Sequence, residues 1–97
     1  MWYNSIMDKI QIIIYDKAGG EGKKYFSQTD TISKMKVYDS ISQEYSDDKI
    51  KRICIQYPPI EVSTLDKGKI IKPIDPVIID ASDKLSKLKE ELGKYYG

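Results

Sequence analysis

Residues 9–16 read KIQIIIYD, and this stretch decides the fold class because its side chains alternate in the way that a β-strand requires. Its even-numbered isoleucines fall on one face of such a strand, whereas Ile13 and Tyr15 fall on the other. A strand with large apolar side chains on both faces is typical of a sheet that is covered on both sides. We therefore expect residues 9–16 to form a central strand.

The segments that follow predict a hairpin and a helix. Residues 18–22 are rich in glycine, which adopts positive φ at little cost, and residues 23–27 can return as an antiparallel partner. Asp30 or Thr31 then offers an N-cap for an amphipathic helix. We expect this first helix to end near Tyr45.

The middle of the chain predicts another strand, followed by a second hairpin or a looped crossing. Residues 50–57 alternate around isoleucine and end at two consecutive prolines. Residues 60–63 and 69–72 flank a turn in which Gly68 supplies the flexible position. Residues 77–79 form either an edge strand or the apolar lead into a last helix, because neighbouring prolines limit strand pairing.

The C-terminal segment predicts an amphipathic helix over about residues 81–96, with Asp80 or Ser82 as its N-cap. Its apolar residues recur at spacings of three and four, as one face of a helix requires. This face can complete the chain's own core, pair with a second copy or dock on another protein. It consists of Leu85, Leu88, Leu92 and Tyr95.

This order of elements predicts an α+β fold with a single small mixed or antiparallel sheet, a central helix and the C-terminal amphipathic helix. Residues 10–75 resemble the ubiquitin-like β-grasp fold in their first hairpin, in a helix opening with Asp30-Thr31-Ile32, in the strand around Ile53 and in the turn at residues 65–69. The resemblance implies a binding scaffold. Conjugation or sulfur-carrier chemistry is not expected, because the chain ends in Lys-Tyr-Tyr-Gly rather than Gly-Gly. A ferredoxin-like split βαβ arrangement is the alternative fold.

The length of 97 residues predicts one domain, at residues 9–97, preceded by an apolar N-terminal extension at residues 1–8. No apolar run is long enough to span a bilayer, and the first residues lack the pattern of a signal peptide, so we expect a cytoplasmic protein without membrane contact. The 16 basic and 15 acidic residues nearly balance, so no general attraction to polyanions is expected.

The residue content argues against most catalytic chemistry. The chain has no His and one Cys, which removes the usual general base and the common ligands of zinc. Cys54 lies in a strand-like setting and is interpreted as a buried, inert thiol. Asp16, Glu21 and Lys23 superficially suggest a metal-dependent nuclease, but they sit in or beside a glycine-rich turn, which we interpret as a solvated hairpin turn. We therefore expect no enzyme activity, catalytic residue, cofactor or metal.

The leading functional hypothesis is a small protein-interaction or adaptor protein that binds a partner or itself, as a homodimer, through its two ends. The alternative is that both ends cap the domain's own sheet. Substituting Leu88 and Leu92 by Glu separates the two, because an interface variant stays folded whereas a core variant unfolds. The predicted interface residues are Trp2, Tyr3, Leu85, Leu88, Leu92 and Tyr95.

A nucleic-acid-binding regulator is the second hypothesis, because basic residues lie next to aromatic residues on predicted strands. The candidate nucleic-acid residues are Lys23, Lys24, Lys49, Lys51, Arg52 and Tyr57.

Two general features bear on the source of the protein. By analogy, such a short chain fits the small accessory proteins of viruses and mobile elements. Its richness in Lys, Glu and Ile is typical of thermophile proteins.

Overall fold

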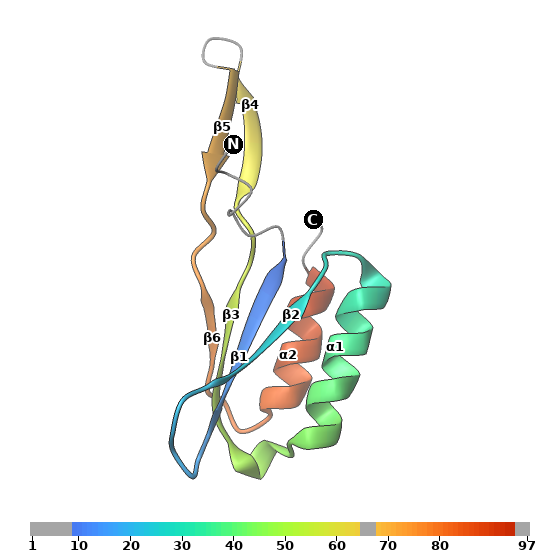
Figure 1. Cartoon of the computed structure of the whole chain (residues 1–97), viewed down its shortest axis with the longest axis vertical. Helices are drawn as coiled ribbons and strands as arrows, with labels where there is room; N and C mark the ends of the chain where they lie inside the picture. Colours follow the sequence, from blue (N-terminus) through green and yellow to red (C-terminus); the bar gives the residue numbers. More distant parts are fainter. Residues whose placement is uncertain (1–8, 65–67, 95–97) are drawn as a thin grey trace.

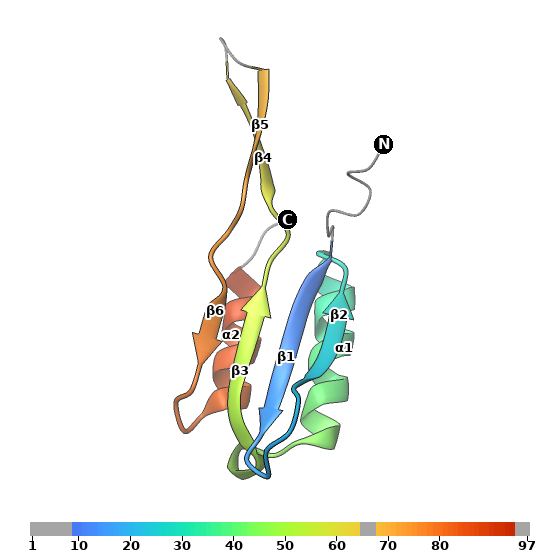
Figure 2. The ribbon, with the colours of Figure 1, turned by 60° about the vertical axis from the view of Figure 1, so that its left-hand side comes forward.

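A four-stranded antiparallel sheet with two helices packed on one of its faces forms the body of the protein (Figures 1 and 2). The computed structural model describes residues 9–64 and 68–94. The strand order is β2-β1-β3-β6, and the predicted α+β class is confirmed. The elements of this body are β1 (Ile10–Asp16), β2 (Lys23–Ser27), α1 (Thr31–Glu44), β3 (Ile50–Gln56), β6 (Val77–Ile79) and α2 (Lys84–Lys94).

Strand β1 lies between β2 and β3, as its sequence predicts for a central strand. Its even-numbered isoleucines are buried beneath the helices. Ile13 and Tyr15 are only half-buried, because both helices pack against the other face. The expectation that this strand is covered on both sides is therefore wrong for the described structure: the apolar residues of one face remain at the surface.

The chain crosses from β2 through α1 to β3, and these two strands run in the same direction with β1 between them. This is one split βαβ unit. The ferredoxin-like alternative needs a second helix that joins two strands, whereas α2 follows β6. The described neighbouring strands are all antiparallel, so the sheet is not mixed, and the specific β-grasp fold is not confirmed.

Helix α1 has the limits that its sequence predicts. The Asp30 carboxylate accepts hydrogen bonds from the backbone N–H of Ser33 at 2.9 Å and from the Ser33 hydroxyl at 2.7 Å. These bonds satisfy a backbone donor that the first turn would otherwise leave unpaired. Tyr45 is the C-cap residue, and its N–H reaches the carbonyl of Ile41.

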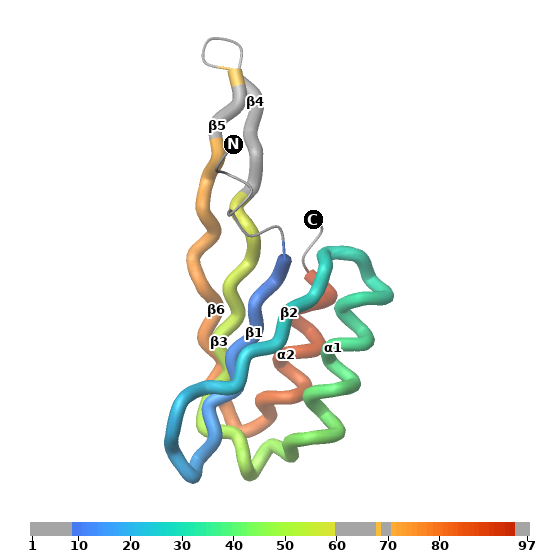
Figure 3. Tube along the Cα trace, in the orientation of Figure 1, coloured from blue at the N-terminus to red at the C-terminus, as the bar shows by residue number. Residues whose placement is uncertain are grey.

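Strands β4 (Ile60–Thr64) and β5 (Gly68–Lys72) confirm the second predicted hairpin, but they form a separate two-stranded sheet that projects from the body (Figures 1 and 3). Its register continues that of the β3–β6 ladder: Ile55 lies opposite Val77, and five residues further along the ribbon Ile60 lies opposite Lys72. The prolines between the two ladders cannot donate backbone hydrogen bonds, so they interrupt the pairing without shifting it.

The Gln56 side chain spans this interruption. Its amide nitrogen donates to the carbonyl of Ile74 at 3.0 Å and to that of Tyr57 at 3.2 Å. The amide thus links the two strands of the ribbon at the point where the backbone ladder stops.

Helix α2 begins at Lys84, later than the predicted start near residue 81, so Asp80 and Ser82 are not its caps. The cap comes from a distant segment instead, because Asp47 accepts the backbone N–H of Leu85 at 2.8 Å. At the other end Lys34 Nζ donates to the carbonyl of Leu92 at 2.8 Å, and the Tyr57 hydroxyl donates to that of Glu91 at 3.1 Å. An acidic group at the N-terminus and a cation at the C-terminus both complement the helix dipole.

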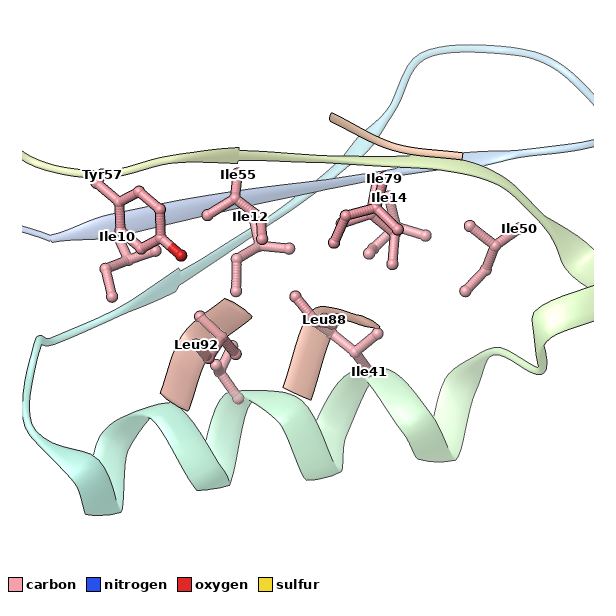
Figure 4. Packing of buried hydrophobic residues seen from close by; sticks show 12 residues of the cluster. Ile10, Ile12, Ile14, Ile41, Ile50, Ile55, Tyr57, Ile79, Leu88 and Leu92 are labelled. Atoms are coloured by element: carbon pink, nitrogen blue, oxygen red, sulfur yellow. The ribbon is translucent and has the colours of Figure 1, made fainter. Parts of the chain in front are cut away.

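The core lies between the sheet and the two helices. Figure 4 shows side chains of β1 and β3 pointing toward Ile41 of α1 and toward Leu88 and Leu92 of α2. Leu88 is fully buried and Leu92 is 3% exposed. The apolar face of the C-terminal helix therefore covers the protein's own sheet.

Candidate interaction surface

The face of the sheet that points away from both helices carries no covering element within residues 9–64 and 68–94, and we call it the open face. Its members alternate along each strand with the buried residues of the core, and the strand register aligns them in rows. The open face consists of Gln11, Ile13, Tyr15, Lys24, Phe26, Arg52, Cys54, Gln56 and Ile78.

An arginine lies over an aromatic ring at one end of the open face. The Arg52 guanidinium carbon is 5.0 Å from the centroid of the Tyr15 ring, and the two residues are direct partners between β3 and β1. This distance is within the range of cation–π contacts, and the planar guanidinium can stack on the ring. The contact places a cationic group over an aromatic ring on an exposed residue of the open face.

Gly22 provides the space that this arrangement needs. A Cβ atom at Gly22 would collide with Ile13 Cγ2 and would lie 3.0 Å from Tyr15 Cε1. The two side chains therefore lean over the glycine backbone. The role of Gly22 is close approach, whereas Gly19, Gly20 and Gly68 adopt the positive φ values that their turns predict.

The open face also carries apolar residues, and those at its margins are exposed. Phe26 on β2 is 52% exposed and Ile78 on β6 is 54% exposed, with Ile13 and Cys54 half-buried between the two strands. The predicted burial of Cys54 is thus only partial. Both charged residues of the open face, Lys24 and Arg52, are basic, so this surface has positive charge although the whole chain is nearly neutral.

The structure separates the predicted nucleic-acid residues. Lys24 and Arg52 lie on the open face, whereas exposed Lys49 and Lys51 lie where β3 begins. Lys51 is skipped by the ladder, because Tyr15 pairs with Arg52 and Asp16 pairs with Ile50. This bulge ends the regular part of the sheet.

Two of the predicted nucleic-acid residues have other roles. Tyr57 is 6% exposed and belongs to the core beneath α2, so its ring is not available for stacking on a base. Lys23 lies on the helix side of β2 and pairs with Glu44 of α1. The hydrogen bond between them raises the pKa of Lys23 and lowers the pKa of Glu44. Burial raises the pKa of the neighbouring Tyr25 hydroxyl.

Sequence reasoning did not select Tyr15 or Phe26 as site residues, although their signal was present. The alternation in residues 9–16 places Tyr15 on the face of the strand that lies away from the buried isoleucines. The hairpin register then places Phe26 on the same face as Gln11. The missing information was which face of the sheet the helices cover.

The three described residues of the predicted protein interface belong to the core or pack against it. Leu88 and Leu92 are buried, and half-buried Leu85 packs against the same cluster. This placement favours the alternative in which the C-terminal helix completes the domain. The remaining predicted interface residues, Trp2, Tyr3 and Tyr95, lie outside the described residues.

A hollow of about 430 Å³ lies between α1 and the end of α2. Several of its polar groups are already engaged: Lys34 holds the Leu92 carbonyl, Asp30 caps α1, and Lys89 lies 5.7 Å from the centroid of the Tyr38 ring. This hollow therefore reflects the helix packing and contributes little free binding chemistry.

Asp16 and Lys23, beside the hairpin turn between β1 and β2, both have partners within the domain. Asp16 accepts the backbone N–H of Ala18 at 2.8 Å, and Lys23 is paired with Glu44. Within residues 9–64 and 68–94, no group of three or more His, Cys, Asp or Glu side chains could hold a metal ion. A strand follows the turn, as the hairpin interpretation predicts.

The two described helices are too short and too polar to cross a membrane. Comparison of the chain with protein-family models, with curated proteins and with solved structures finds no match.

Proposed function

We propose that this protein is a non-enzymatic binding module that holds single-stranded nucleic acid against the open face of its sheet. One observation carries the proposal: the face left uncovered by the helices combines a 52% exposed ring, Phe26, with a guanidinium that lies over the Tyr15 ring and a further cation, Lys24. This is the combination of stacking surfaces and positive charge that single strands require.

The geometry suits unpaired bases better than a duplex. Bases of a single strand can lie flat on the Phe26 ring and on the Arg52 guanidinium, whereas stacked bases inside a duplex offer no exposed π-face. Lys24 is directly opposite Ile13 between these two platforms and can contact a phosphate. Gln11, which faces Gln56 across β1 and β3, supplies an amide donor and acceptor for base edges.

Fluorescence anisotropy with labelled single-stranded DNA, single-stranded RNA and duplex DNA tests the proposal. We expect binding to the single strands that weakens with salt, because phosphate contacts release counterions. Arg52→Ala removes a stacking platform and a charge, and we expect affinity to fall about 5- to 150-fold, which corresponds to about 1–3 kcal/mol for a stacked base.

Lys87→Ala is the matched control, because it removes one positive charge from an exposed position of α2 in the helix layer. It should leave affinity almost unchanged if binding occurs on the open face. Equal losses in the two variants would mean that only general charge acts, and absence of binding by the wild-type protein at low salt would refute the proposal.

A protein partner on the same face is the second candidate. Ile13, Cys54 and Ile78 form an apolar row across three strands, which a partner's apolar residues could cover. Wild-type protein that binds no oligonucleotide would favour this adaptor function.

A further inference from the structure

The two edges of the four-stranded sheet differ in their capacity to accept another strand. The β6 edge has three residues and is preceded by Pro76 and followed by Asp80, a combination that limits further pairing. The β2 edge has five residues without proline, and its register with β1 is unbroken. In the described structure β2 pairs on one side only. Its outer side therefore presents backbone donors and acceptors to solvent.

A groove follows this edge. It has a volume of about 490 Å³ and is bordered by Tyr25, Phe26 and Ser27 of β2 and by Lys36, Val37 and Ser40 of α1. The unpaired edge and the groove beside it together offer a site where a strand could be added to the sheet.

We propose that the occupant is β2 of a second copy, paired antiparallel about a two-fold axis that passes beside Tyr25. Such an axis pairs a residue that lies a given number of positions before Tyr25 in one copy with the residue that lies the same number of positions after Tyr25 in the other copy. All five residues pair only when Tyr25 faces its own copy. Lys24 then lies opposite Phe26 of the partner subunit, and Lys23 lies opposite Ser27 of the partner subunit.

This register is self-complementary in charge. Each Lys24 lies opposite Phe26 of the partner subunit, so the dimer can form two cation–π contacts. The two Lys24 side chains do not face each other, which avoids direct repulsion. Centring the pairing on Lys24 would instead place two lysines face to face.

The product is one eight-stranded sheet with both open faces on the same side. The pairing uses backbone groups of the edge and does not depend on nucleic-acid binding. It places the predicted homodimer on β2 instead of the C-terminal helix.

Light scattering and sedimentation velocity on nucleic-acid-free protein test the pairing over a range of concentrations. We expect wild-type protein to have twice the monomer mass of 11.2 kDa. Phe26→Lys places two lysines opposite each other at both contacts and should give a folded monomer. The double variant Lys24→Glu with Phe26→Lys restores opposite charges across the axis and should recover the dimer.

Ile78→Lys is the control, since it adds the same charge at a 54% exposed position of the opposite edge strand and should leave the dimer intact. Circular dichroism confirms that each variant is folded. A monomeric wild type, a Phe26→Lys variant that stays dimeric, or a double variant that stays monomeric would overturn the proposal. Because nucleic acid is absent, each of these outcomes leaves the proposed function to be judged by its own experiment with Arg52.

Discussion

The two faces of the sheet are built from the same strands and differ in what covers them. On the covered face, Ile12 and Ile55 are fully buried beneath helices that are fixed at several points. On the open face, their neighbours Ile13 and Cys54 remain half-buried, with exposed Phe26 and Ile78 at the margins. The covered face thus stabilises the fold, whereas the open face keeps apolar and cationic groups at the surface, as a binding surface requires.

This difference depends on helix α2, because its position is set by contacts from outside the helix. Asp47 binds its first turn, and Lys34 and Tyr57 bind its last carbonyls. The amphipathic pattern alone would allow the helix to face a partner. These side-chain contacts and the burial of Leu88 direct it onto the sheet.

The largest contrast between the faces should appear when one large residue on each is truncated. Leu88→Ala removes a fully buried side chain and should lower the free energy of unfolding by about 2–5 kcal/mol, since it leaves a cavity. Ile78→Ala, at a 54% exposed position of the open face, should change it by less than about 0.5 kcal/mol. Urea denaturation followed by circular dichroism measures both. Similar losses would show that the open face is covered in solution.

A smaller effect is expected from the cap that fixes α2. Asp47→Ala leaves the N–H of Leu85 without its carboxylate acceptor and should cost about 0.5–2 kcal/mol, the usual range for loss of an N-cap. Asp75→Ala removes the same charge from an exposed position outside the helices and serves as the control. Equal stability of the two variants in urea denaturation would mean that the contact with Asp47 does not hold the helix.

The smallest effect concerns the ion pair between β2 and α1. The pKa of Glu44 is lowered from its ordinary value of 4.5, so its contribution to stability is present above that value and is lost as pH falls through the lowered pKa. The pKa of Lys23 is raised above 10.5, so its contribution is lost only in strong alkali. Thermal unfolding from neutral pH to acid should therefore show a shallower decline for Glu44→Gln than for wild type. Parallel curves would show that the pair contributes nothing, as many exposed pairs do.

The local elements of the fold follow from the sequence because their signals act over a few residues. The alternation in residues 9–16, the cap at Asp30 and the end of α1 at Tyr45 depend on neighbouring side chains and backbone groups. The projecting hairpin was predicted from Gly68, but its separation from the main sheet was not. Strand pairing beyond the prolines depends on long-range backbone geometry.

The candidate site was only partly predictable for the same reason. Lys24 and Arg52 were selected as basic residues next to aromatic residues, and both lie on the open face. Tyr57 has the same local pattern and lies in the core. Neighbouring positions on a strand point to opposite faces, so one-residue spacing cannot distinguish exposed from buried until one face is covered.

The α+β class, the first hairpin and the two amphipathic helices follow from the sequence, because periodicity, caps and turn residues specify backbone conformation locally. Tertiary structure alone decided that α2 covers the protein's own sheet, that Asp47 caps it from another segment, and that the second face is left open. Those outcomes require contacts between residues far apart in the chain, such as Asp47 with Leu85 and Lys34 with Leu92, and no local pattern encodes which distant partner a side chain will meet.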